Sequence, residues 1–207
     1  MENNLVKIST TTITSNEAFG KLIEFTNSCR LVDCDASDML DSAKDLEIID
    51  SDLKEGLFVR AKIKDNLGLF HPYKNPTEDI ITNTKVKLLQ SEECTITWVE
   101  ESYINKAVIS GDACFTASSN IDFAQINQMG YILVKDGAII QKADIYGTVK
   151  VFNGIIVDVI LHPGGRLISY DNAQIREIKS SDQRPISSLY RMENIGSRSI
   201  GAKYFYG

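Results

Sequence analysis

Histidine and cysteine are the residues of this chain best suited to chemistry at neutral pH, and they are few. The sequence holds two histidines, His71 and His162, and four cysteines. An imidazole changes its charge near neutral pH, and a cysteine thiolate is a nucleophile. His71, His162 and Cys114 are therefore the candidate residues of a small intracellular enzyme or ligand-binding module whose site is built from loops.

The local sequence around each histidine favours a structural position. His71 and His162 each follow two apolar residues and precede a proline. This pattern is typical of a strand that ends in a turn, because a proline disfavours the helical conformation in the residue before it. The chain also has no Gly-x-Ser-x-Gly motif, which would mark a nucleophilic serine. The spacing therefore identifies no catalytic residue, and we predict that the protein is not an enzyme.

Metal and phosphate sites also lack their motifs. Cys29 and Cys34 are the closest cysteines, and a structural zinc site would need a second pair. Aspartates from Asp33 onward resemble a calcium loop, but Asp38 stands where glycine is required and Lys44 where glutamate is required. No Gly-x-Gly-x-x-Gly or Walker motif occurs. We expect no metal and no cofactor.

The amino-acid composition indicates the broad class of protein. The 207 residues are 43% hydrophobic and 24% charged, which fits one globular domain or a small pair of domains. The net charge of −6 argues against direct binding to nucleic acid or to an anionic membrane. We find no signal peptide and no apolar run of membrane-spanning length. With irregularly spaced cysteines, these features predict a protein of the reducing cytoplasm.

The first third of the chain shows helical spacing. Thr14 and Glu17 have the spacing of a capping box, which predicts a helix up to Phe25. A second helix is expected from Asp35, because the apolar residues that follow it recur at helical intervals. A short third helix is expected at 121–126, where Asn120 would be the capping residue.

The rest of the chain shows strand signals. Apolar and polar residues alternate over 57–64, and further strands are expected near 85–90, 94–100 and 103–110. Between 131 and 170, Asp136-Gly137 and Asn153-Gly154 separate strand-like runs, a pattern typical of type I′ hairpins. The sequence therefore predicts an α+β, β-dominated fold with an antiparallel meander sheet, sandwich or barrel-like, one or two N-terminal helices and an extended C-terminal arm. The expected segments are 1–56, 57–179 and 180–207.

Charge is unevenly distributed among these segments of the chain. Residues 33–55 hold nine acids and two lysines, while residues 176–207 hold six basic and three acidic residues. The basic arm ends in aromatic residues, so we expect it either to dock on a neighbouring subunit or to pack as a strand on its own domain. The candidate interaction residues are Arg184, Tyr190, Arg191, Arg198, Lys203, Tyr204, Phe205 and Tyr206 in the arm, and Asp38, Asp41 and Asp45 in the acidic segment.

These features together favour a structural protein. Identical subunits with one acidic face and one basic arm can bind head to tail and close into a ring. We therefore predict a homo-oligomeric ring or tube whose partners are copies of itself and other structural proteins. A neck or tail ring of a tailed phage, and hence a virion location, is the specific setting that this architecture suggests.

Overall fold

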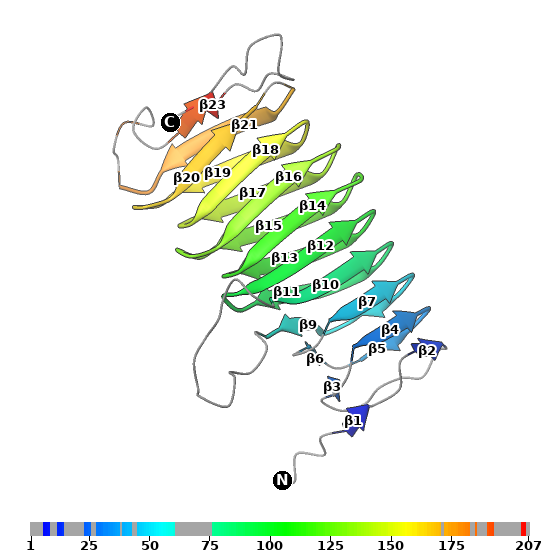
Figure 1. Cartoon of the computed structure of the whole chain (residues 1–207). Helices are drawn as coiled ribbons and strands as arrows, with labels where there is room; N and C mark the ends of the chain where they lie inside the picture. Colours follow the sequence, from blue (N-terminus) through cyan, green and yellow to red (C-terminus); the bar gives the residue numbers. More distant parts are fainter. Residues whose placement is uncertain are drawn as a thin grey trace, which may run out of the picture.

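The chain forms an all-β structure in the part that can be described. The computed structural model describes residues 28–37, 39–42, 45–60, 76–170, 172–182, 185 and 190. It also gives the backbone of residues 6–8, 12–14, 23–25, 191–192 and 204–205. Within these residues the strands form two sheets, here called sheet A and sheet B, and no helix is present (Figure 1).

The chain alternates between the two sheets along most of its length. Sheet A comprises β1 (Val6–Ile8), β3 (Ile23–Phe25), β5 (Asp35–Ala36), β6 (Met39–Ser42), β8 (Asp52–Leu53), β9 (Gly56–Val59), β11 (Lys85–Ser91), β13 (Tyr103–Ile109), β15 (Asn120–Ile126), β17 (Ile139–Ile145), β19 (Ile155–Leu161) and β21 (Gln174–Ser180). Sheet B comprises β2 (Thr12–Thr14), β4 (Cys29–Val32), β7 (Leu46–Ile49), β10 (Thr77–Thr82), β12 (Thr95–Glu100), β14 (Asp112–Thr116), β16 (Tyr131–Lys135), β18 (Thr148–Phe152), β20 (Arg166–Ser169), β22 (Tyr190–Met192) and β23 (Tyr204–Phe205).

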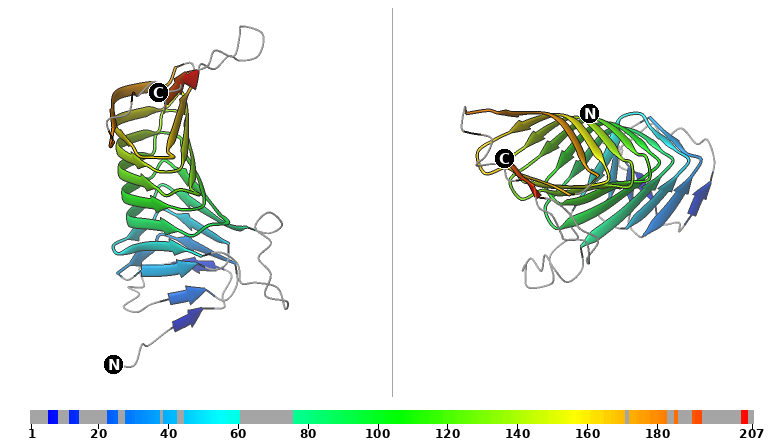
Figure 2. Two further views of the ribbon diagram at one scale, coloured as in Figure 1. Left: turned by 90° about the vertical axis from the view of Figure 1, so that its left-hand side faces the viewer. Right: turned by 90° about the horizontal axis from the view of Figure 1, so that it is seen from above.

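The strands stack as the rungs of a β-solenoid. Each strand pairs in parallel with the strand of the same sheet in the next rung, and only the β22–β23 pair among the described strands is antiparallel. Paired residues of neighbouring rungs from β10 to β20 are 16 to 19 residues apart. Figure 2 shows the rungs lying one above another, with β1 at one end of the stack and β21 at the other. Each repeat therefore contacts mainly its neighbours, as in other solenoids.

The core lies between the two sheets and consists of stacked columns of apolar side chains. In sheet A, the column through Ala107, Ala124 and Ala143 is fully buried. In sheet B, Phe115 and Val134 are equally buried in the facing column. Burying each large side chain contributes about 1.5–3 kcal/mol. Among the described residues, the core thus runs from β4 to β20, because each of these rungs adds apolar residues to the same columns.

A kink interrupts each long strand of sheet A. In β13, Ile104 and Ala107 are buried, but Asn105 and Lys106 between them both face outward. The register with β15 skips one position at this point. Two consecutive outward residues bend the strand, as in a β-bulge. In the rung of β8 and β9 the same place is a full break, at Lys54 and Glu55.

Two features stabilise the corners that lead from sheet B to sheet A. At least one residue at each described corner has a left-handed backbone conformation, and in several rungs a side-chain hydroxyl bonds to backbone groups of its own and neighbouring rungs, an arrangement we call the hydroxyl ladder. Asp136 and Asn153 have φ of 52° and 50°, a conformation that aspartate and asparagine tolerate. In the four rungs from Ser51 to Ser119, the residue after the left-handed one carries a hydroxyl. The Ser102 Oγ accepts a hydrogen bond from the Thr84 N–H at 3.0 Å and donates one to the Glu100 carbonyl at 2.6 Å.

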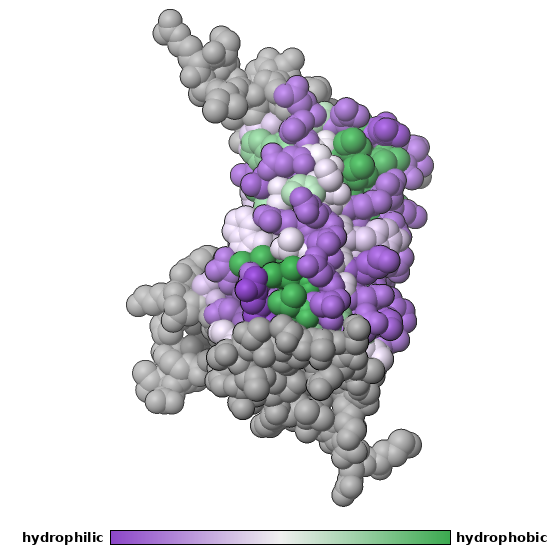
Figure 3. Space-filling view, turned by 90° about the vertical axis from the view of Figure 1, so that its right-hand side faces the viewer, coloured by the Kyte–Doolittle hydropathy of each residue, from purple (hydrophilic) through white to green (hydrophobic). Residues whose placement is uncertain are grey.

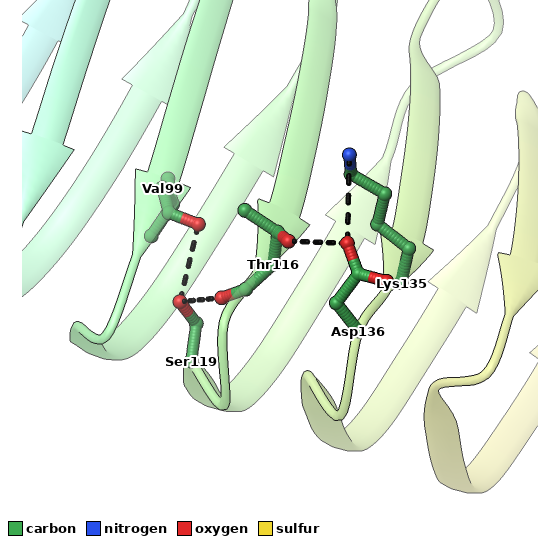
Figure 4. A network of polar contacts seen from close by, with 5 residues as sticks. All are labelled: Val99, Thr116, Ser119, Lys135 and Asp136. Atoms are coloured by element: carbon green, nitrogen blue, oxygen red, sulfur yellow. Dashed lines mark hydrogen bonds and ion pairs between the residues drawn. The ribbon is translucent and has the colours of Figure 1, made fainter.

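The ladder continues over several rungs. The Thr84 Oγ1 accepts from the Ser51 N–H at 3.2 Å, and the Ser119 Oγ donates to the Val99 and Thr116 carbonyls at 3.1 and 2.6 Å (Figure 4). From Ala138 onward the equivalent positions are small apolar residues. The hydroxyls satisfy buried backbone groups that would otherwise lack partners at the turn.

The opposite corners, from sheet A to sheet B, are crowded against backbone. A Cβ atom added to Gly147 would lie 2.2 Å from the Asn127 carbonyl oxygen, and one added to Gly165 would lie 2.1 Å from the Ile145 carbonyl oxygen. Real side chains cannot approach a backbone atom so closely. Glycine at these positions therefore allows each rung to lie directly on the preceding one.

The structure corrects the predicted antiparallel meander. Asp136-Gly137 and Asn153-Gly154 do form turns, but each turn carries the chain from sheet B across to sheet A. A hairpin would instead return the chain beside itself in one sheet. Successive strands therefore face each other across the core, and every pair from β10 to β21 is parallel. The residue types at the turns indicate the local backbone conformation, but they do not indicate which strands pair with each other.

The predicted helices are also wrong. The residues of the expected 121–126 helix form β15, in which Ile121, Ala124 and Ile126 are buried. The kink places two outward residues between Ile121 and Ala124, so the buried positions are three apart, as on a helix. Ile23–Phe25, at the end of the first expected helix, forms β3, while residues 15–22 of that helix lie outside the described residues. The second expected helix is replaced by β5, β6 and β7.

The individual strand positions agree better with the sequence pattern. The strands expected at 85–90, 94–100 and 103–110 coincide with β11, β12 and β13, and β9 covers the start of the run expected at 57–64. Residues 61–75 lie outside the described part. The segment boundary expected between 56 and 57 lies within β9, and the one between 179 and 180 lies within β21.

Candidate functional site

The described residues of the predicted histidine and cysteine site lie apart. Cys114 lies in β14 of sheet B, whereas His162 lies at the corner before β20, three rungs further along the stack. Three rung spacings are about 14 Å. His162 stacks on Tyr146 with ring centroids 3.9 Å apart. His71 lies outside the described residues, so Cys114 and His162 form no nucleophile–base pair.

The environment of Cys114 also opposes nucleophilic chemistry. Only 5% of this residue is exposed. Burial raises the pKa of its thiol, and the carboxylates of Asp136 and Glu100 raise the pKa further, while Lys135 acts in the opposite direction. A reactive cysteine needs a lowered pKa. Cys114 is therefore suited to packing.

Among the described residues, no group of three or more histidine, cysteine, aspartate or glutamate side chains is placed to hold a metal ion. The described part of the chain also has no helix long and apolar enough to cross a membrane.

A shallow polar groove follows the A-to-B corners of the middle rungs. Its lining includes Glu93, Ser110, Gln125, Asn127 and Tyr146. The Gln125 amide donates to the Asn127 Oδ1 at 3.0 Å, and the Asn127 amide donates to the Ser110 Oγ at 2.9 Å. These amides and hydroxyls bond mainly to one another. The ligand-binding alternative stays a prediction, with this groove as the place where it could be tested.

The acidic segment lies in the rungs at the N-terminal end of the stack, and several of its carboxylates have partners there. Asp41 is buried and pairs with Arg60 at 2.8 Å. The Asp45 Oδ1 accepts the Glu78 N–H at 2.8 Å. Glu47 pairs with Arg30 at 3.0 Å. Asp38 lies outside the described residues. Internal pairing thus reduces the charge that the segment presents to a neighbour.

Only a small part of the predicted basic arm is described. Tyr190 lies in β22, which pairs with β20, and its hydroxyl is 3.2 Å from the Ser169 Oγ. Burial raises the pKa of this phenol. The backbone of Arg191 continues β22, and Tyr204 and Phe205 form β23 beside it. Arg184, Arg198, Lys203 and Tyr206 lie outside the described residues.

The outer face of sheet B carries a separation of charge that the linear sequence does not show. Its described outward side chains in β4 to β14 include four carboxylates and one guanidinium, whereas those in β16 to β20 include three bases and no acid. The acids are Glu47, Glu78, Glu100 and Asp112 beside Arg30, and the bases are Lys135, Lys150 and Arg166.

An apolar and aromatic column runs along the middle of this face, through part of both charged halves. The register aligns Ile80, Trp98, Cys114 and Leu133 in one column of the face. Ile80 is 39% exposed, and the indole N–H of Trp98 donates to the Glu78 Oε1 at 2.7 Å. The column is bordered on the basic side by Lys150, whose ammonium lies 5.4 Å from the Tyr131 ring centroid.

A hollow opens at the acidic end of this face. It is lined by Arg30, Asp45, Glu47, Glu78 and Ile80, among others. Carboxylates beside one exposed isoleucine make this hollow suited to a long cationic side chain with an apolar stem. In contrast to the outer face of sheet B with its apolar column, the surface that faces the right-hand side of Figure 1 is mostly hydrophilic, with two small hydrophobic areas (Figure 3).

Comparison with protein-family models, with curated proteins and with solved structures finds no significant match.

Sequence reasoning missed the outer face of sheet B, although a signal for it exists. The motif Ile-x-x-Ala-x-Ile starts at Ile104 and recurs at Ile121 and Ile140. The copies of this motif recur at intervals close to the 16 to 19 residues of one rung, and an internal repeat with such a near-constant period indicates a solenoid. Aligning the chain on the repeat would have placed Glu78 and Arg166 in one column of one face.

Proposed function

We propose that this chain is a non-enzymatic structural protein that assembles with copies of itself. The observation that carries the proposal is the polarity of the solenoid: carboxylates concentrate in its N-terminal rungs, and the outward bases of sheet B lie in its C-terminal rungs. A face of the rod that is acidic toward one end and basic toward the other is complementary to the same face of another copy. A ring or tube would follow from end-to-end contacts that close. The phage neck or tail ring stays a prediction.

Sedimentation velocity over a range of micromolar concentrations tests this proposal. We expect the average mass to rise with concentration at about 50 mM NaCl, and the rise to shrink at about 500 mM NaCl, because salt screens charges separated by more than a few ångströms. A species that stays monomeric at every concentration and salt would contradict the proposal.

A further inference from the structure

The outer face of sheet B is self-complementary when one copy is turned over onto another. Consider a two-fold axis that runs parallel to the strands, between β14 and β16. Such an axis reverses the order of the rungs and keeps each column opposite itself. The acidic half of one copy then faces the basic half of the other.

The register defines which residues would meet. Glu78 and Arg166 occupy the same column, five rungs apart, with Ile96, Asp112, Tyr131 and Thr148 between them. The axis therefore places Glu78 opposite the partner's Arg166, and Arg166 opposite the partner's Glu78. In the middle column the same axis places Ile80 opposite the partner's Ile168 and Trp98 opposite the partner's Lys150. Carboxylate meets guanidinium, apolar meets apolar, and a cation meets an aromatic ring.

The shape of the face fits this pairing. Arg166 is exposed, and the hollow at the acidic end is lined by Glu78, Ile80 and the ion pair between Arg30 and Glu47, so that Glu78 is the carboxylate available to a partner. The guanidinium of the partner's Arg166 would enter this hollow, and its methylene stem would lie near Ile80. Each dimer has two such contacts, related by the axis.

The size of the face is sufficient for a reversible dimer. Six rungs from β10 to β20 span about 29 Å, and a strand of five or six residues spans about 17 Å. The area is then about 500 Å² on each copy, or about 1,000 Å² in total, which is the lower limit for a specific interface. Interfaces near this limit are typical of transient contacts, so we expect a dimer that dissociates reversibly.

We infer that the outer face of sheet B is an antiparallel homodimer interface, in which Glu78 of each copy binds the partner's Arg166. This inference rests on the proposed function, since it names the surface by which copies associate. Combined with end-to-end contacts, such a dimer would produce two rings placed face to face.

Charge reversal tests the inference in the full-length protein. We expect Arg166→Glu and Glu78→Arg each to weaken dimerisation at least tenfold in sedimentation velocity, because each places two like charges opposite each other. An equimolar mixture of the two variants should regain association, since every contact then joins opposite charges. The double variant should regain it for the same reason. Lys142→Glu, an exposed change on sheet A, is the matched control and should leave dimerisation unchanged.

The outcomes separate the inference from the proposed function. Both substituted positions are exposed, so each variant should keep the circular dichroism spectrum and melting temperature of the wild type. If the wild type associates and neither substitution weakens it, or if mixing fails to restore it, the interface lies elsewhere and the inference is overturned while the proposed function stands. If the wild type never associates, both are wrong.

Discussion

The two sheets of the solenoid share one core, but the charged and apolar side chains on their outer faces are arranged differently. The strands of sheet A are kinked, and outward side chains of both signs alternate along the stack, with Lys106 in β13, Asp122 in β15, and Lys142 and Asp144 in β17. Sheet B lacks the kink, keeps its acids and bases in separate halves and concentrates apolar residues at its centre. A mixed surface favours solubility, whereas separated charges select partners and orientations. This difference is what the dimer interface inferred above requires of sheet B.

The largest expected effect comes from breaking the stacking on which both faces depend. Gly165→Val would force side-chain atoms onto the Ile145 carbonyl oxygen, which is 2.1 Å from the position of a Cβ atom. We expect a loss of at least about 4 kcal/mol in the free energy of unfolding, measured by urea denaturation, because backbone cannot easily move aside. The exposed change Gln141→Ala on sheet A should cost less than about 0.5 kcal/mol. Equal losses in the two variants would contradict the tight stacking of the corners.

A smaller loss is expected at the corner that joins the two faces. Ser102→Ala removes the oxygen that accepts the Thr84 N–H at 3.0 Å and leaves this buried donor without that partner. The expected cost is about 1–3 kcal/mol in urea denaturation. Ser181→Ala, at an exposed turn, is the control and should have no measurable effect. If both serine variants unfold at the same urea concentration, the hydroxyl ladder does not stabilise the corner.

The contrast between the faces is sharpened by removing one aromatic residue from each. Trp98→Ala on sheet B should weaken self-association at least tenfold, because aromatic residues at the centre of an interface contribute most of its binding free energy. Phe123→Ala on sheet A should leave association unchanged, although Phe123 also contacts a lysine, Lys106, at 5.8 Å. Analytical ultracentrifugation of both variants makes the comparison. Equal weakening by both would remove the distinction between the faces.

The smallest effect concerns an exposed ion pair on sheet A. The Lys179 Nζ lies 2.7 Å from the Glu177 Oε1. The ammonium lowers the pKa of the Glu177 carboxyl below its ordinary value, and the carboxylate raises the pKa of Lys179 above the ordinary lysine value. A lowered carboxyl pKa in the folded state stabilises the fold above the ordinary glutamate pKa, and this contribution is lost as the pH falls through the folded value. In Lys179→Gln, an NMR titration should show the Glu177 pKa rising toward its ordinary value. An unchanged pKa would show that the pair does not form in solution.

Local features of the fold could be predicted from the sequence. Alternation of apolar and polar residues located β11, β12 and β13, because a half-buried strand imposes this pattern on its own residues. Asp136 and Asn153 indicated left-handed turns for an equally local reason. Which strands pair depends on contacts between rungs, and a short window of sequence does not contain them. The kink in β15 added a further error, since it spaces buried residues as a helix does.

The candidate surface was less accessible to prediction. Segment charges suggested a polarity, but Asp41 is buried against Arg60, and Glu47 pairs with Arg30, so part of the acidic charge is neutralised within the fold. The separated charges of sheet B arise from columns whose members are 16 to 19 residues apart in the chain. Only the register brings Glu78 and Arg166 into one line, and the register follows from the repeat.

The near-constant length of the rungs also determines how the molecule would respond to mechanical force. A pull applied to the two ends of the stack would detach one terminal rung at a time, because each rung is held mainly by its neighbours. Every rung between β10 and β20 would release 16 to 19 residues, a gain of about 60 Å in contour length per event. The molecule would thus lengthen in steps of nearly equal size, and an assembly built from it could yield under load without losing all of its folded structure at once.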